Sequence, residues 1–139
     1  MQTYLPKWLW LALMSTFWWG LWAFLVKLAS AHLNPFQMQV LFVAGMAPLL
    51  AAVLARTRFS VQTDRLGVFY GVLNGVLATL GMLAFYAAMQ KGTASVVGPV
   101  TALFPIVTVA GSMLILNERL NAVQGAGACL AVAAILLFA

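Results

Sequence analysis

Long apolar segments, with every charged residue except Lys27 at their junctions, are the feature of this chain that most restricts its fold. The segments cover residues 8–29, 36–55, 66–89, 94–116 and 122–138. About 20 residues of α-helix cross a hydrocarbon core of roughly 30 Å, so the first four segments are long enough and the fifth is marginal. Charged residues make up 6% of the sequence, whereas a soluble domain has about 25%. The chain is therefore predicted to be an integral membrane protein.

The apolar segments also select one kind of secondary structure. Backbone polar groups in hydrocarbon must be hydrogen-bonded internally, which leaves α-helices or closed β-barrels. These segments are continuously apolar and lack the alternation of barrel strands. We predict an all-α membrane fold, a bundle of five transmembrane helices that forms one domain over residues 1–139. A cleaved signal peptide is the weaker interpretation of the first segment, which is longer than the usual signal region and has no clear cleavage site.

Basic residues are distributed unequally over the junctions. Alternate junctions, which an up-and-down chain brings to one face of the membrane, contain Lys7, Arg56, Arg58, Arg65 and Arg119. The other face has Lys91, with Lys27 if it is counted. The positive-inside rule then predicts a cytoplasmic N-terminus and a C-terminus on the outer face. This distribution also argues against nucleic acid as the partner of a chain with a net charge of +5.

Several residues predict where the helices begin, bend and pack. Pro35 suits the first turn of the second helix, and Asn121 can cap the last helix. Pro48, Pro99 and Pro105 each remove a backbone donor and predict bends in the second and fourth segments. Two prolines in the fourth segment are equally consistent with two interpretations: a moving or pore-lining helix, and ordinary packing.

Aromatic and polar residues inside the helices are candidates for a solute cavity. Ser15, Trp19 and Trp22 are spaced by four and three residues, which places them on one face of the first helix, with Trp18 beside them. Indole rings at this depth can offer their faces to an apolar, aromatic or cationic solute. Packing in the core or against lipid is the alternative for each of them. The full candidate set is Ser15, Trp18, Trp19, Trp22, Asn74, Tyr86, Thr101 and Pro105.

Two further features of the helices have a structural and a functional interpretation. Gly67, Gly71 and Gly75 recur at every fourth position, followed by Thr79, and predict a face for close helix packing. Lys27 lies near the end of the first segment, so we expect its ammonium group to reach the headgroup region. An ionisable residue within a span is also a candidate for function.

No constellation typical of an enzyme is present in the sequence. There is no Cys/His cluster, no carboxylate pair within a span and no phosphate-binding glycine loop, and Asp64 and Glu118 are the only acidic residues, both at junctions. We therefore predict no catalytic residue, no metal and no cofactor. A helical bundle with an aromatic, sparsely polar interior suits transport of a small solute better than catalysis.

Motifs along essentially the whole chain resemble the EamA domain of the drug/metabolite transporter superfamily. The most specific ones lie between residues 85 and 120. They are Phe85-Tyr86-Ala87-Ala88-Met89-Gln90, Pro99 and Pro105 in the fourth segment, and Asn117-Glu118-Arg119-Leu120 before the last helix. Trp19-Gly20 with Phe24 and Lys27 resembles the first helix of that family.

The resemblance implies secondary active transport, often export, of metabolites or drugs across the bacterial inner membrane. Most family members contain two such units in tandem with inverted topology, so this chain would be half of an inverted-repeat transporter. By resemblance, Pro105 bends a cavity-lining helix, and Trp19 and Gly20 face the cavity. Family members often have an Arg near the start of the second helix, where this chain has Phe42 or its neighbours, so no contact through that charge is expected.

A second half-size unit is the expected partner, together with membrane lipid and a small-molecule solute. Inverted repeats form their shared site at the interface between them. The charge bias opposes an antiparallel homodimer and favours a paired homologous chain, although both stay open. Three other functions remain: a subunit of a lipid-linked sugar flippase, a small multidrug-resistance-like cation antiporter, or a non-transporting scaffold subunit. The antiporter is disfavoured because the first helix lacks the membrane-embedded Glu on which such proteins depend.

Overall fold

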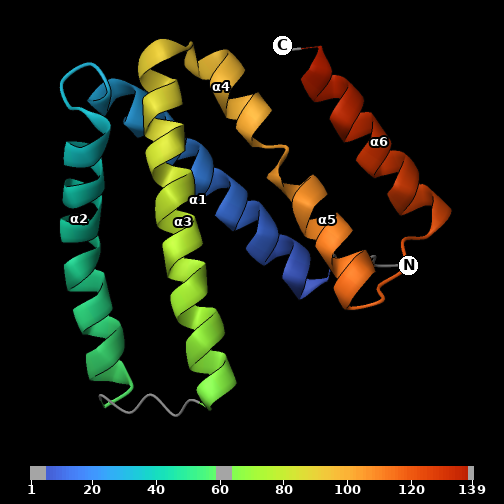
Figure 1. Ribbon diagram of the computed structural model, residues 1–139, viewed down its shortest axis with the longest axis horizontal. Helices are drawn as coiled ribbons and strands as arrows, with labels where there is room; N and C mark the ends of the chain where they lie inside the picture. Colours follow the sequence, from blue (N-terminus) through green and yellow to red (C-terminus); the bar gives the residue numbers. More distant parts are fainter. Residues whose placement is uncertain (1–5, 59–63, 138–139) are drawn as a thin grey trace. The chain divides into compact units, whose positions relative to one another are not determined.

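The computed structural model describes residues 6–58 and 64–137, and this part of the chain is helical with short connections (Figure 1). The helices are α1 (Lys7–Ala29), α2 (Pro35–Arg56), α3 (Arg65–Lys91), α4 (Ala94–Thr101), α5 (Phe104–Ile115) and α6 (Ala122–Leu136). They form two compact units, α1 to α3 in unit 1 and α4 to α6 in unit 2, and each unit is described by itself. The single domain expected over residues 1–139 stays a prediction.

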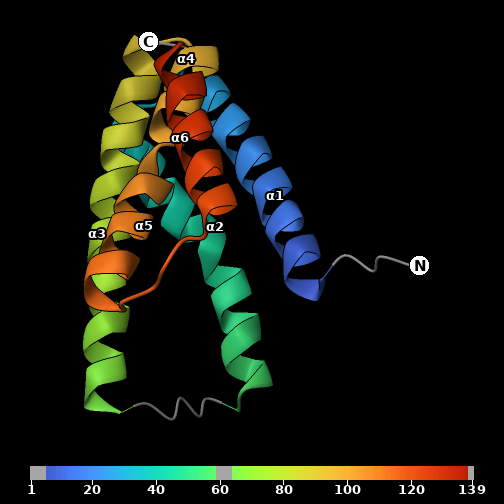
Figure 2. The same ribbon diagram turned by 90° about the vertical axis from the view of Figure 1, so that its right-hand side faces the viewer.

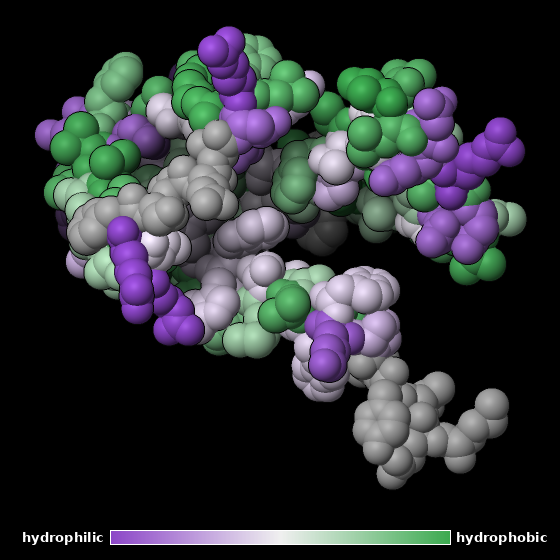
Figure 3. Space-filling model, turned by 90° about the horizontal axis from the view of Figure 1, so that it is seen from below, coloured by the Kyte–Doolittle hydropathy of each residue, from purple (hydrophilic) through white to green (hydrophobic). Residues whose placement is uncertain are grey.

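The length and surface of the helices suit a bilayer. Helices α1, α2 and α3, and the segment Ala94–Ile115 that α4 and α5 make together, are long and apolar enough to cross a membrane. Helix α6 has 15 residues, which corresponds to about 22 Å and is short of a hydrocarbon core. Large apolar side chains such as Leu49 and Val107 are 70% and 76% exposed. In the view of Figure 3, hydrophilic residues form separate patches among apolar residues. The predicted all-α membrane fold is confirmed.

Polar side chains start three of the helices. Asn34 caps α2 through a capping box, in which Asn34 Oδ1 accepts the Gln37 N–H at 2.9 Å and Gln37 Oε1 accepts the Asn34 N–H at 3.0 Å. Asn121 and Gln124 make the same pair of bonds at the start of α6, at 2.8 and 2.9 Å. Backbone donors at a helix start have no partner within the helix, and in lipid no water replaces one. The expected roles of Asn121 as a cap and of Pro35 in the first turn of α2 are confirmed.

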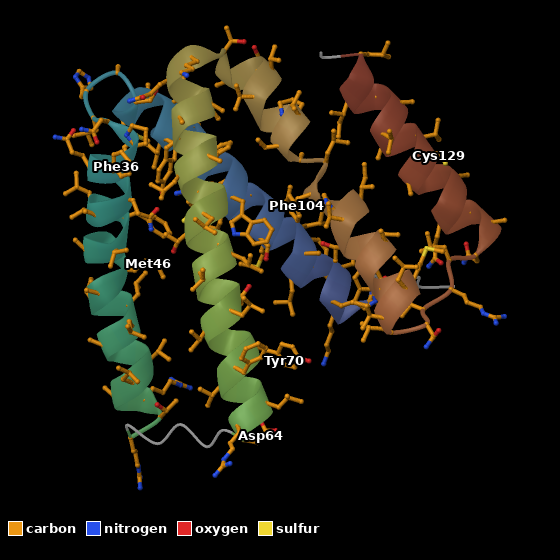
Figure 4. The ribbon with its side chains drawn as sticks, in the orientation of Figure 1. Phe36, Met46, Asp64, Tyr70, Phe104 and Cys129 are labelled. Carbon is orange, nitrogen blue, oxygen red and sulfur yellow. The ribbon has the colours of Figure 1, made fainter. Side chains whose placement is uncertain are left out.

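Asp64 caps α3, and this cap explains why residue 67, the first position of the predicted packing face, is a glycine. Its Oδ1 accepts the Gly67 N–H at 2.8 Å, at the helix start labelled by Asp64 in Figure 4. A Cβ atom at Gly67 would lie 2.6 Å from this oxygen. A Cβ atom at Gly71 or Gly75 would meet no described atom within 4 Å. Gly67 therefore serves the start of α3, and the face through Gly71 and Gly75 has open space beside it.

The fourth apolar segment, expected as one helix over residues 94–116, is divided in the structure. Helix α4 ends at Thr101 and α5 begins at Phe104 (Figure 4). Pro105 has no N–H to donate to the Thr101 carbonyl, and the Ile106 N–H donates to the Leu103 carbonyl at 2.9 Å in place of an α-helical bond to Ala102. The Thr101 hydroxyl bonds back to the carbonyls of Val97 and Gly98, at 2.8 and 2.9 Å. The predicted bend near Pro105 is thus a break of the helix.

The connection from α5 to α6 uses a left-handed residue. Asn117 has a φ of 55°, a region that Asn adopts more readily than most residues. The backbone N–H of Glu118 donates to the Ser112 carbonyl at 3.2 Å and so closes the end of α5. This bond and the left-handed Asn117 end α5 before the connection to α6.

The three helices of unit 1 are packed at one end. Contacts join α2 to α3 and α1 to α3, and Figure 2 shows the three helices converging near the α1–α2 connection and separating toward the opposite end. The buried residues of unit 1 in the described part are Val26, Met38, Tyr86 and Met89, and all of them lie at the converging end. The core of unit 1 is therefore confined to one end of its spans.

Candidate functional site

A small apolar pocket lies between the helices at the converging end of unit 1. Its volume is about 170 Å³, and its lining residues are Trp22, Leu25, Val26, Ala29, Leu33, Met38, Leu41, Phe42 and Tyr86. None of these nine residues is charged, and the Tyr86 hydroxyl and the Trp22 indole N–H are their polar side-chain groups. Such a lining suits an apolar or aromatic group.

The pocket follows from the spacing of residues on two helices. On α1, Trp22, Val26 and Ala29 are separated by four and three residues, which brings them to one face. On α2, Met38 and Phe42 are four residues apart and share a face in the same way. Tyr86, which is 1% exposed, contributes from α3. Eight of the nine lining residues thus lie on α1, α2 or α3, and Leu33 lies in the connection between α1 and α2.

Aromatic rings form one wall of the pocket. Trp22 stacks on Phe85 with ring centroids 5.3 Å apart and an angle of 21° between the planes. Phe42 and Tyr86 each lie 6.2 Å from the Trp22 ring, Phe42 edge-on and Tyr86 tilted. Aromatic pairs in these geometries contribute about 0.5–1.5 kcal/mol beyond the area that they bury. The stack on Phe85 orients the Trp22 indole beside the pocket.

Two polar side chains join the helices beside this pocket. The Lys27 ammonium group donates to the Met89 carbonyl at 2.7 Å. The Gln90 amide donates to the Leu33 carbonyl, also at 2.7 Å. We expected the Lys27 side chain to extend into the headgroup region, and the structure gives it a protein partner in the last turn of α3. The signal that could have suggested this bond was the position of Lys27 in the last turn of its own helix.

The candidate residues of α1 lie along the face that leads into the pocket. Trp22 lines it, and Ser15, Trp18 and Trp19 precede Trp22 by seven, four and three residues on the same face. Trp18 and Trp19 are 58% and 62% exposed, where α1 separates from its neighbours. The Ser15 hydroxyl donates to the Leu11 carbonyl at 3.0 Å. The structure therefore places one of these four residues, Trp22, in the pocket wall and the other three outside it.

The remaining candidates are divided between the two units. Tyr86 lines the pocket, and Asn74 is exposed on α3. Thr101 and Pro105 lie in unit 2 at the break between α4 and α5. The structure brings Trp22 and Tyr86 together, and the complete candidate set stays a prediction.

Sequence reasoning missed the contribution of α2 and one ring of α3. Met38, Leu41 and Phe42 were not candidates, although their spacing of three and four residues marks one helical face. Phe85 entered only as part of a family motif, and its stack on Trp22 was not expected. Phe42, at or near the position where family members often have an Arg, lines the pocket.

Metal chemistry has no support from the side chains of the described part. Among residues 6–58 and 64–137, no group of three or more His, Cys, Asp or Glu side chains could hold a metal ion. Cys129 is exposed on α6 (Figure 4). The candidate site of unit 1 therefore consists of aromatic and aliphatic residues, with two side-chain hydrogen bonds beside it.

Comparison with known proteins agrees with this architecture. The chain is 32% identical over 127 residues to an uncharacterized protein of Methanocaldococcus jannaschii, a match that covers 91% of this chain and 92% of the relative. No solved structure matches the chain. The model of the EamA-like transporter family matches residues 6–139, which confirms the resemblance seen in the sequence motifs. The chain is a multi-pass membrane protein and belongs to the EamA-like transporter family.

Proposed function

We propose that the chain is one half of a secondary transporter that exports a small metabolite or drug-like solute, and that it works with a second five-helix unit. The observation that carries this proposal is the uncharged pocket whose wall contains Trp22, Phe42 and Tyr86. Membership of the family supports membrane transport as the class of activity, and the pocket could bind part of the solute. The partners that we propose are the surrounding lipid, the solute and the second unit.

The size of the pocket supports the need for a second unit. Sites that enclose a drug-sized molecule have volumes of about 300–1,000 Å³, whereas this pocket has about 170 Å³. It can hold one ring or a short aliphatic group, and the rest of the solute needs another wall. The small volume of the pocket therefore favours a second unit as the source of that wall.

The chemistry of the wall favours a solute with an apolar or aromatic part. Trp22 and Phe42 bring ring surfaces to the lining, and ring faces also attract cations at short range. The lining contains no carboxylate that would select a cation by charge. We therefore propose that the solute is recognised by the shape and polarisability of a ring or chain.

The proposal is tested by binding and transport with matched tryptophan variants. The purified chain, in lipid nanodiscs, is screened against metabolites and drugs by its melting temperature and its tryptophan fluorescence, because a ligand of the folded form raises the melting temperature. Trp22→Ala is expected to weaken binding of a hit by about two- to tenfold, since an aromatic contact contributes about 0.5–1.5 kcal/mol and 1.4 kcal/mol is a factor of ten. Trp10→Ala, which replaces a Trp that is 58% exposed, is the control.

Transport of the same hit into sealed vesicles completes the test. The chain is reconstituted alone and with a co-purified second unit, and uptake should fall in Trp22→Ala but not in Trp10→Ala. Equal uptake in both variants would remove the pocket from the solute path. Movement of a labelled lipid between leaflets, without solute uptake, would identify a flippase subunit. Absence of both activities in the presence of the partner would identify a scaffold.

A further inference from the structure

We propose that Lys27 and Gln90 form a polar clamp that closes the converging end of unit 1, so that the pocket communicates with one side of the membrane until the clamp is released. Lys27 is then a positioning residue for the solute pocket. The proposal rests on the proposed function for its role in transport, but the clamp itself is a property of unit 1.

The clamp consists of two hydrogen bonds that join separate elements. Lys27 on α1 donates to the Met89 carbonyl 62 residues later, and Gln90 on α3 donates to the Leu33 carbonyl 57 residues earlier. Both distances are 2.7 Å, which is short for an N–H···O bond. The first bond joins α1 to α3, and the second joins α3 to the connection between α1 and α2. All three spans of unit 1 are thereby linked at one end.

The chemistry of the acceptors explains why a Lys is suited to this position. The last four carbonyls of a helix lack helical partners and form the negative end of its dipole. Met89 belongs to the last turn of α3, which ends at Lys91. An ammonium group therefore satisfies a carbonyl that lipid cannot satisfy, and this charge-assisted bond is stronger than a neutral one.

The residues of the clamp adjoin the residues of the pocket. Leu33 lines the pocket and accepts the bond from Gln90. Lys27 follows Val26, which lines the pocket and is 6% exposed. Tyr86 lies one helical turn before Gln90. A change in either bond would thus act on the pocket wall directly.

The opposite end of the three spans has no comparable closure among the described residues. Trp18 and Trp19, on the pocket face of α1, are 58% and 62% exposed. The helices separate toward this end in Figure 2. The helices of unit 1 are therefore joined where Lys27 and Gln90 lie and are separated toward the opposite end.

Thiol labelling tests the clamp without any knowledge of the solute. In a Cys129→Ala background, Val26→Cys places one thiol in the pocket wall, and a membrane-impermeant maleimide is added to either side of sealed vesicles. His32→Cys, an exposed position in the α1–α2 connection, identifies the side of the clamped end. Lys91→Met is the matched control, because Lys91 is an exposed lysine at the same end of α3.

Removal of the clamp should open the pocket to the side marked by His32→Cys. Lys27→Met is expected to raise the labelling rate of Val26→Cys from that side by about tenfold. The variant loses one hydrogen bond from a charged donor, and this loss favours the open form of unit 1 by about that factor. Lys91→Met should leave the rate unchanged, and Lys27→Arg, which keeps a charged donor, should restore most of the protection. Gln90→Leu should raise the rate by a smaller factor, because its bond is neutral.

The same measurements separate failure of the clamp from failure of the proposed function. Equal labelling rates in Lys27→Met and Lys91→Met would overturn the clamp, even in a chain that transports a solute. Faster labelling in Lys27→Met would support it, even in a chain for which no solute is found. If Lys27→Met does not reach the membrane, the labelling rates of Gln90→Leu and Lys27→Arg test the proposal instead. A wild-type rate in Gln90→Leu would overturn it. A faster rate in Gln90→Leu, together with protection in Lys27→Arg, would support it.

Discussion

One buried oxygen atom on α2 has no hydrogen-bond donor in the described part of the chain. It is Oε1 of Gln39, which follows the buried residue Met38. A buried acceptor without a partner costs about 1–3 kcal/mol relative to a satisfied one. Gln37, two residues earlier, makes two bonds with Asn34 in the capping box. Two glutamines of the same helix therefore have opposite effects on its stability.

Replacement of each glutamine by Met should change the stability of the chain in opposite directions. Gln39→Met keeps the length of the side chain and removes the unpaired acceptor, so the unfolding free energy should rise by about 1 kcal/mol. Gln37→Met removes a capping bond and should lower it by about 1 kcal/mol. Melting temperatures of the two variants in the same lipid nanodiscs measure the difference. A lower melting temperature for Gln39→Met would show that its amide oxygen has a donor in the membrane.

At the scale of elements, the break between α4 and α5 is the largest departure from the expected helices. Pro105 removes the donor that would pair with the Thr101 carbonyl, and the Thr101 hydroxyl competes for carbonyls of the preceding turn. Pro48 lies inside α2, which continues without interruption through it. A proline alone therefore does not divide a span in this chain, and the local bonds around Pro105 contribute to the break.

Pro105→Ala is expected to join α4 and α5 into one helix. The new N–H can donate to the Thr101 carbonyl, and a proline in a helix interior costs about 3 kcal/mol relative to alanine. Amide hydrogen exchange at residues 102–106 should become slower by at least about tenfold, since 1.4 kcal/mol corresponds to a factor of ten. Pro48→Ala is the control and should leave exchange at residues 102–106 unchanged. Unaltered exchange in Pro105→Ala would mean that another part of unit 2 maintains the break.

The elements that could be predicted from the sequence are those that depend on local chemistry. The lengths of the apolar segments predicted the spans. Pro35 and Asn121 predicted two helix starts, because each of these residues acts within one turn of its own helix. The partner of Lys27 and the pocket face of α2 depend on which helices meet. A helix that is apolar all round has no polar face to mark its exterior, so Met38 and Phe42 could not be distinguished from residues that contact lipid.

At the scale of the whole molecule, the charges of unit 1 are separated between its two ends. Lys7 begins α1, and Arg56 and Arg65 end α2 and begin α3, so all three lie at one end of the spans. Lys27 and Lys91 lie at the other end, and Lys27 is engaged by the Met89 carbonyl. The structure thus gives the charge bias of the sequence a spatial basis.

This bias should fix a single orientation, with the end that carries Arg56 and Arg65 in the cytoplasm. In a Cys129→Ala background, Thr57→Cys and His32→Cys lie at opposite ends of α2, and both positions are exposed. An impermeant thiol reagent should label His32→Cys in intact cells, and Thr57→Cys only after the membrane is permeabilised. Labelling confined to His32→Cys would require a second unit of opposite charge bias, because a copy in the same orientation cannot supply an inverted repeat. Labelling of both positions in intact cells would contradict the fixed orientation and make the antiparallel homodimer the working assembly.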